Sequence, residues 1–276
     1  MCPRRRRRGD TSKGLLDTMN ILLTNDDGIH AEGINSLYNA LSQDHTVYVI
    51  APGCEQSASS NAITVHSQLN IKKIAENKFS VNGFPADCVI IGLSGNLIPD
   101  VDLVIAGINH GPNVGDDLIF SGTVAAARTG YIFGKDAIAI SINCYKRASQ
   151  FVDDASQFLL RFINEIKHEG NGASPIDGDE VPKMSVFKTF FNINYPDLPP
   201  AKIKGRVYTH VGRRIYRDSF QKTKFINNEA LVQMGGYIES VFDRGSDTTE
   251  LDNGFISITP LIIDSTDYSV LKKHLG

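Results

Sequence analysis

The sequence predicts an α/β protein, with a mostly parallel sheet, flanking helices and a smaller β-rich C-terminal region. Two observations support this fold class. Between residues 19 and 168, short apolar segments alternate with segments of helical periodicity, which is typical of parallel βαβ units. After residue 186, apolar segments continue with little helical pattern between them.

The first βαβ unit begins at Met19. Residues 20–24 are apolar, as in a short buried strand, and the polar residues 25–28 predict a turn. The next segment predicts a helix, because its apolar side chains recur at i, i+3, i+4 and i+7: Ile34, Leu37, Tyr38 and Leu41. Residues 46–51 predict the second strand, and the small polar residues 53–61 predict the loop after it.

The alternation continues through the middle of the chain. Residues 63–82 predict short strands with turns, and a helix is expected to begin at Pro85. Residues 101–106 predict a buried strand, and residues 107–117 a glycine-rich loop. Ser121 is suited to cap the helix that follows.

A third strand-helix unit precedes a change of pattern. Residues 137–142 predict a strand, residues 151–168 an amphipathic helix, and residues 170–182 a polar linker. Beyond the linker we expect strands at 186–193, 206–211 and 255–258 and a short helix at 267–274, and residues 220–237 have the composition of an extended arm. We therefore divide the chain into a tail at 1–18, a catalytic core at 19–199 and a β-rich oligomerisation region at 200–276.

Composition excludes several classes of protein. The 276 residues carry a net charge of −3, and no apolar run reaches the roughly 18 residues of a membrane helix. The four cysteines form no CxxC pair, which argues against a zinc site or a disulfide framework and predicts a cytoplasmic location. We expect no membrane partner.

The N-terminal tail differs in charge from the rest of the chain. Residues 4–8 are five arginines, and residues 1–18 carry a charge of +4, which leaves −7 for the remainder. We expect a disordered tail; a nucleic-acid-binding arm is the alternative. The acidic body makes nucleic acid an improbable partner, except weakly through the tail.

Three loops are expected to meet at one edge of the sheet, because ligands bind at the carboxyl ends of parallel strands. They are residues 25–28 with Asp26 and Asp27, residues 53–61 with Ser57, and residues 107–117 with Asn109. Two adjacent carboxylates repel each other, and Mg²⁺ or Mn²⁺ with oxygen ligands would offset that repulsion. The alternative for the two aspartates is a solvated turn that caps a helix.

The segment of Ser121, Gly122 and Thr123 has two interpretations. Hydroxyl groups and free amides at a helix start form an anion site, whereas Ser121 alone is equally suited to be a plain N-cap. No Gly-Lys-Ser/Thr follows the glycine-rich loop, and the first turn is not a GxGxxG motif. P-loop ATP hydrolysis and nicotinamide binding are therefore poorly supported.

Four motifs in this order resemble the SurE family of stationary-phase survival proteins, which are metal-dependent nucleotidases. The motifs are Asn25-Asp-Asp-Gly-Ile-His-Ala-x-Gly33, Ala51-Pro52 with Ser57-Ala-x-Ser-Asn61, Gly107-Ile-Asn-x-Gly-Pro-Asn-x-Gly-Asp-Asp117, and Ser121-Gly-Thr-Val-Ala-Ala-Ala127. The likeness extends from Met19 to about Asp267. It implies a Rossmann-like core, homodimers or homotetramers, and a C-terminal segment exchanged between subunits.

The resemblance also implies residue roles. One divalent metal ion per subunit would be held by Asp26, Asp27, Ser57 and Asn109, and the two aspartates would act in catalysis. The substrate phosphate would lie against Asn113, Ser121, Gly122 and Thr123. Two positions depart from the family pattern, which often has an acidic residue at Gly53 and a histidine at Tyr268.

The expected function is that of a 5′-nucleotidase. The enzyme would hydrolyse nucleoside 5′- and 3′-monophosphates to nucleoside and phosphate, and short polyphosphate as some family members do. One alternative is a phosphatase with an aspartyl nucleophile, although such enzymes usually present Asp-x-Asp rather than adjacent aspartates. Another is a nucleotide sensor without catalysis, against which the complete set of oxygen ligands argues.

Overall fold

The computed structural model describes residues 18–145, 149–170, 188–217, 220–227 and 229–274. Residues 1–17 of the tail predicted at 1–18, most of the expected linker at 170–182 and the start of the strand expected at 186 lie outside these residues. Within them, a nine-stranded sheet has the order β3-β4-β2-β1-β5-β6-β7-β13-β8. None of the described helices has the length and apolar character that a membrane crossing requires.

The centre of the sheet is parallel, as the sequence predicts. Strands β1 (Asn20–Thr24), β2 (Thr46–Pro52), β5 (Leu103–His110), β6 (Asp136–Asn143) and β7 (Phe190–Pro196) all run the same way, and β4 (Lys78–Val81) pairs parallel with β2. Strand β3 (Ile71–Ala75) pairs antiparallel with β4. The chain leaves β1 toward β2 and later returns to add β5 on the other side of β1. This reversal is the point at which open α/β sheets bind ligands.

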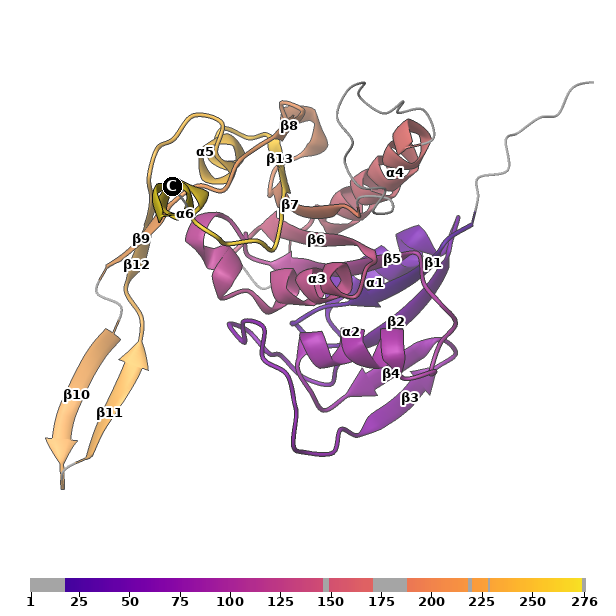
Figure 1. Cartoon of the computed structure of the whole chain (residues 1–276), viewed down its shortest axis with the longest axis horizontal. Coiled ribbons are helices and arrows are strands. Elements are labelled where there is room, and N and C mark those ends of the chain that lie inside the picture. Colours follow the sequence, from indigo (N-terminus) through magenta and orange to yellow (C-terminus); the bar gives the residue numbers. More distant parts are fainter. Residues whose placement is uncertain (1–17, 146–148, 171–187, 218–219, 228, 275–276) are drawn as a thin grey trace, which may run out of the picture.

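Helices cover both faces of the sheet (Figure 1). Helices α1 (Glu32–Leu41) and α4 (Val152–Gly170) pack on one face, and α2 (Pro85–Ser94) and α3 (Gly122–Ile132) on the other. The predicted face of α1 is the buried one, with Ile34, Leu37 and Leu41 almost fully covered. Ser121 caps α3 as predicted, and its hydroxyl accepts a hydrogen bond from Val124 N at 3.0 Å.

The C-terminal region contributes to two structures. Strands β8 (Arg206–Tyr208) and β13 (Ile256–Pro260) join the main sheet beside β7, with the short helix α5 (Asp247–Asp252) before β13. The other strands form the arm, which we define as residues 213–242. It contains β9 (Arg214–Arg217) paired with β12 (Tyr237–Ser240), and β10 (Phe220–Ile226) paired with β11 (Glu229–Met234).

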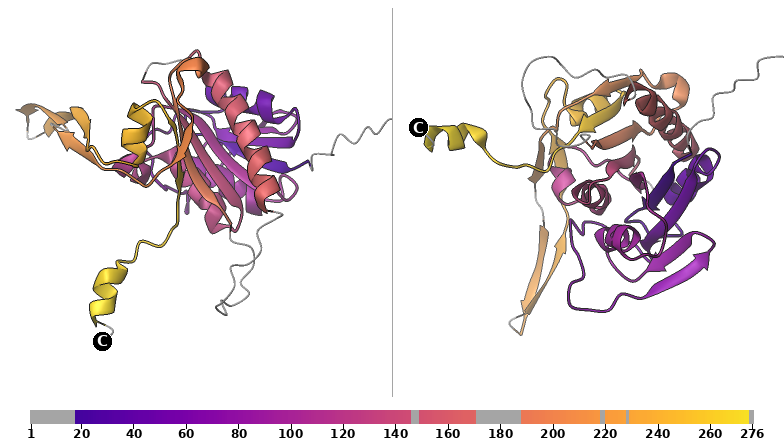
Figure 2. Two further views of the ribbon diagram at one scale, coloured as in Figure 1. Left: turned by 90° about the horizontal axis from the view of Figure 1, so that it is seen from above. Right: turned by 45° about the vertical axis from the view of Figure 1, so that its right-hand side comes forward.

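Figures 1 and 2 show the β10–β11 hairpin projecting away from the body of the molecule. Helix α6 (Tyr268–His274) projects in a different direction at the end of an extended segment (Figure 2). The two antiparallel pairs form the small C-terminal sheets, and the sequence predicted an arm without resolving its strands. Whether residues 19–199 and 200–276 behave as separate regions stays a prediction.

One boundary near the predicted site differs from expectation. Sequence analysis placed residues 107–110 in a loop, whereas β5 continues through His110 with an irregular register between Ala106 and Asn109. Asn109 therefore pairs with Ser141 on β6 and lies within the sheet, near the carboxyl end of β5. The glycines that suggested a loop are tolerated here because the bulge relaxes the regular pleat.

Candidate functional site

The first loop follows β1 and carries the adjacent carboxylates. Asp26 is almost fully buried and accepts hydrogen bonds from Thr123 N at 3.1 Å and from the Thr123 hydroxyl. Burial raises the pKa of the Asp26 carboxyl to about 6; the hydroxyl bond from Thr123 opposes the shift, and the charge of Asp27 adds to it. Burial also raises the pKa of Asp27 to about 6, and the charge of Glu55 adds to the shift.

Helix α3 packs tightly on this loop because its first residue is glycine. A Cβ atom on Gly122 would lie 3.0 Å from Asp26 Oδ2 and 2.7 Å from Ser59 Oγ. The absence of a side chain lets the N-terminus of α3 reach Asp26, so that Thr123 donates from both its backbone and its side chain. A helix N-terminus favours a negative charge, and here that charge is an aspartate of the protein.

The second loop is fastened to the first. Gln56 N donates to the carbonyl oxygen of Asp26 at 2.7 Å, which holds the neighbouring Ser57 close to the carboxylates. The Ser57 hydroxyl donates to Glu55 Oε1 at 2.7 Å. Ser57 therefore presents lone pairs of its oxygen to the space in front of Asp26.

The third loop is anchored by amide side chains from β7. The carbonyl oxygen of Asn113 accepts from Asn192 Nδ2 at 2.8 Å and from Asn194 Nδ2 at 2.9 Å, and Asn113 N donates to Asn194 Oδ1 at 2.8 Å. The side-chain amide of Asn113 donates to Ser141 Oγ at 2.8 Å. Asn109 is also fixed, since its Nδ2 donates to the carbonyl oxygen of Gly111 at 2.7 Å. Its Oδ1 remains available as an acceptor at the pocket that Asn109 lines.

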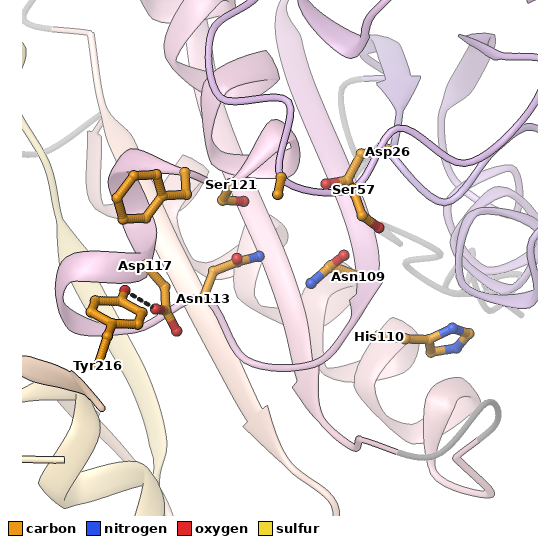
Figure 3. A pocket seen from close by; sticks show the side chains of 10 residues that line it. Asp26, Ser57, Asn109, His110, Asn113, Asp117, Ser121 and Tyr216 are labelled. Carbon is orange, nitrogen blue, oxygen red and sulfur yellow. Dashed lines mark hydrogen bonds between the residues drawn. The ribbon is translucent and has the colours of Figure 1, made fainter. Parts of the chain in front are cut away.

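These loops border one pocket of about 640 Å³ (Figure 3). Its lining consists of Asp26, Ser57, Ala58, Asn109, His110, Asn113, Asp117, Phe120, Ser121 and Tyr216. Of the predicted metal ligands, Asp26, Ser57 and Asn109 line it, whereas Asp27 is not part of the lining and accepts a hydrogen bond from His110 N at 3.4 Å through Oδ2. Of the predicted phosphate ligands, Asn113 and Ser121 line the pocket, whereas Gly122 and Thr123 pack against Asp26.

Five lining residues were not predicted as site residues: Ala58, His110, Asp117, Phe120 and Tyr216. Asp117 ends the glycine-rich motif, Phe120 precedes the cap of α3, and Tyr216 comes from β9 in the arm. Tyr216 Oη donates to Asp117 Oδ1 at 2.5 Å, and Arg214 Nη1 forms an ion pair with Asp117 Oδ2 at 2.5 Å. The Asp-Asp pair at 116–117 was a visible signal, but no local pattern indicates that β9 returns to this loop.

A buried carboxylate joins the glycine-rich loop to the base of the arm. Asp247 is fully buried and accepts hydrogen bonds from Gly115 N at 3.0 Å and from Gly212 N at 2.8 Å. Gly115 begins the 3₁₀ turn that carries Asp117 (Gly115–Ile119), and Gly212 lies just before β9. Asp247 thus sets the relative position of the two segments that bring Asp117 and Tyr216 together.

The donor set fits a hard divalent cation. In the described part of the chain, no three His, Cys, Asp or Glu side chains gather as a metal site, and neither Asp26 nor Asp27 has an ion pair there. Two carboxylates, a hydroxyl and an amide oxygen form an all-oxygen set of the kind that Mg²⁺ and Mn²⁺ prefer. Of the residues that line the pocket, His110 has a buried Nε2 without a hydrogen-bond partner among the described residues.

Comparison with known proteins identifies the family. The family model described as "Survival protein SurE" matches residues 21–218, which is more than half of the chain. The chain belongs to the SurE family. The resemblance seen in the motifs of the first half is therefore confirmed.

The relatives match along nearly their whole length. The 5′-nucleotidase SurE of Leptospira interrogans is 37% identical over 256 residues, covering 92% of this chain and 96% of the relative. The 5′-nucleotidase SurE of Pseudoalteromonas atlantica is 38% identical over 255 residues, with the same shares covered. These relatives are hydrolases of the class that the sequence predicted.

A solved relative confirms the fold. The crystal structure of the SurE protein from Aquifex aeolicus superposes with a TM-score of 0.74 at 31% sequence identity, and the match covers 92% of this chain and 98% of that one. The predicted α/β class, with its mostly parallel sheet, flanking helices and small C-terminal β-region, is thus confirmed for this SurE protein.

Proposed function

We propose that this SurE protein is a metal-dependent phosphatase that hydrolyses nucleoside 5′-monophosphates to nucleoside and inorganic phosphate. Its membership of a family of 5′-nucleotidases supports the reaction class. The observation that carries the proposal is the meeting of Asp26, Ser57, Asn109 and Asn113 at one pocket next to Asp27.

In the proposal, Asp26, Asp27, Ser57 and Asn109 hold one Mg²⁺ or Mn²⁺ ion per subunit. A cation bound there supplies Lewis-acid polarisation of a phosphate oxygen and a water of lowered pKa. The carboxylate of Asp26 is held by the two hydrogen bonds from Thr123, so that it faces the pocket in one orientation. Asp27 is the less buried of the two, and we assign to the pair the orientation and deprotonation of the attacking water.

The other lining groups are proposed to bind the transferred phosphoryl group. Asn113 has its backbone fixed by β7 and its side-chain amide held by Ser141 Oγ, so that its side chain is a preorganised polar group in the pocket. Ser121 lies at the start of α3, where the helix dipole favours an anion. Gly122 and Thr123 contribute indirectly in this scheme, by fixing Asp26 and the first turn of α3.

A phosphate-release assay tests the proposal. Purified protein is treated with a chelator and assayed on AMP, GMP, CMP and UMP with Mn²⁺, with Mg²⁺ or with neither. We expect release only with a divalent ion; metal-independent release, or none with any nucleotide, would overturn the assignment. Adding 3′-AMP and tripolyphosphate tests the wider substrate range expected from the sequence. Trapping a phospho-enzyme would instead support an aspartyl nucleophile.

We also propose that the enzyme is a cytoplasmic homodimer or homotetramer. The four cysteines lie far apart in the sequence and form no CxxC pair, as expected of a chain from a reducing compartment. The arm exposes Ile215, Tyr237, Ile238 and Phe242, and exposed apolar side chains of this size favour burial against a second copy of the chain. Analytical ultracentrifugation measures the mass directly, and a monomer at micromolar concentration would contradict the proposal.

A further inference from the structure

Two aromatic rings line the pocket beside the loops of the metal site. Phe120 and Tyr216 both belong to its lining, and their ring centroids lie 6.1 Å apart with planes at 87°. The two residues remain 54% and 40% exposed, so each ring keeps a substantial area uncovered. Figure 3 shows Tyr216 and Asp117 on the opposite side of Asn113 from Asp26 and Ser57. A nucleotide whose phosphate lies against Asn113 and Ser121 therefore has the two rings within the same pocket.

The Tyr216 ring is held in place by charged groups. Its hydroxyl donates to Asp117 Oδ1, and Asp117 Oδ2 is paired with Arg214, whose side chain is only 8% exposed. Arg214 N donates in turn to Asp116 Oδ2 at 2.8 Å, which fixes β9 to the 3₁₀ turn. A ring held in advance loses little conformational entropy when a ligand stacks on it, and preorganisation of this kind increases affinity.

We propose that Phe120 and Tyr216 form the subsite for the nucleobase, which stacks on one or both rings, and that Asp117 and Arg214 are positioning residues for Tyr216. The inference rests on the proposed function and names the part of the protein that recognises the nucleoside end of the substrate. Stacking requires only a π-face, which every base has. The carboxylate of Asp117 is already engaged by Tyr216 and Arg214, so the subsite discriminates weakly between bases.

The first experiment separates the nucleoside end from the phosphate end. The ratio of kcat/KM for AMP to that for methyl phosphate, which has no ring to stack, is compared between wild type and Phe120→Ala. We expect this ratio to fall roughly tenfold, chiefly through KM for AMP. Phe133→Ala is the matched control, because Phe133 is a similarly exposed ring at the other end of α3, and it leaves the ratio unchanged.

Further variants distinguish stacking from apolar packing. Phe120→Leu keeps an apolar side chain but removes the ring. If the base stacks on the ring, the kcat/KM ratio falls in this variant; if the base only packs against an apolar side chain, the ratio is retained. Tyr216→Phe keeps the ring and loses the hydroxyl bond to Asp117, and it reduces the ratio less than Tyr216→Ala does. An unchanged ratio in Phe120→Ala or Phe120→Leu would overturn the inference, as would equal effects of the two Tyr216 variants.

Equilibrium binding keeps the inference independent of turnover. Titration calorimetry of AMP against the wild type and Phe120→Ala measures affinity at low temperature and short times, with Ca²⁺ in place of the activating ion. If the wild type releases no phosphate from any nucleotide, the proposed function fails; weaker AMP binding by Phe120→Ala would still support the aromatic subsite. The aromatic subsite would be overturned if both proteins bound AMP equally. It would also be overturned if Phe120→Ala changed the sedimentation mass without changing the affinity for AMP.

Discussion

The central strands and the arm differ in how far their side chains are buried within the subunit. In β1 and β5 almost every residue is buried, because helices cover both faces of the sheet. In β12 every residue is exposed, and in β9 all but the first, although both strands carry large apolar side chains. The core therefore obtains its stability from its own subunit, whereas the arm has apolar surface left to bury.

This difference also separates two kinds of site residue. Asp26 and Asn109 stand at the ends of fully covered strands, so their positions are set by the core. Tyr216 stands on a strand of the arm and reaches the pocket through Asp117 and Arg214. The comparison predicts that changes in the core act on chemistry and that changes in the arm act on assembly and on substrate affinity.

The largest effect is expected from a core carboxylate. Asp27→Asn should reduce phosphate release from AMP at saturating Mn²⁺ by at least about 100-fold, because a neutral amide replaces a ligand and a charge at the site. Asp27 is partly exposed, so the variant should fold, as circular dichroism and thermal melting will check. The control Asp100→Asn changes an exposed carboxylate that forms an ion pair with Lys135, and it should retain activity. Near-normal turnover in Asp27→Asn would contradict the metal assignment.

The second test removes the distal part of the arm and leaves the core intact. Residues 220–234 are replaced by a short Gly-Ser linker, which preserves the pairing of β9 with β12. We expect the sedimentation mass to shift from the wild-type oligomer toward the monomer. The reason is that the hairpin projects from the body of the molecule, where it can contact a second subunit. The proposed metal ligands are untouched. An unchanged mass would mean that the hairpin does not hold the subunits together.

A third variant weakens the junction of the two regions. In Asp247→Asn, one carboxylate oxygen becomes an amide donor, so that it faces the N–H group of Gly115, which binds Oδ2, or that of Gly212, which binds Oδ1. The loss of a charged acceptor in a buried place should lower the free energy of unfolding by about 2 kcal/mol. Urea denaturation measures it, with Asp252→Asn, an exposed carboxylate on the same helix, as the control expected to stay within about 0.5 kcal/mol. Equal stabilities would show that the junction does not depend on this charge.

The smallest effect is expected from the N-terminal tail. A chain that starts at Met19 retains β1 and every lining residue of the pocket. Its kcat/KM for AMP should lie within about twofold of the full-length value, as expected of residues that precede the first strand and match no motif, and the same phosphate assay measures it. A folded truncation without activity would place part of the tail in the site and move the core boundary upstream.

Local patterns were sufficient where a residue's role depends on its neighbours in sequence. The strand at 20–24, the helical face of α1 and the cap at Ser121 were predicted because periodicity and capping are local. The loops of Asp26, Ser57 and Asn109 could be brought together because parallel strands end on one edge. The continuation of β5 through Asn109 was missed, since glycine is usually a sign of a loop.

Contacts between distant segments could not be read in this way. The bonds from Asn192 and Asn194 to Asn113 join residues about eighty positions apart, and Asp247 meets Gly115 across a greater separation. Tyr216 lies in a segment whose mixture of basic and apolar residues predicts neither its strand partner nor its approach to Asp117. These contacts depend on the packing of the whole chain, which no single motif encodes.

Gly122 has a consequence for how this protein tolerates mutation. A methyl group there would lie 2.7 Å from Ser59 Oγ and 3.0 Å from Asp26 Oδ2. A replacement must displace these neighbours or α3 itself, and a shift of α3 would weaken the hold of Thr123 on the carboxylate. In a selection for activity across all substitutions, position 122 should be as intolerant as the aspartates, without a reactive atom of its own. Evolutionary constraint at this site thus extends to Gly122, which contributes by having no side chain and so lets α3 approach Asp26.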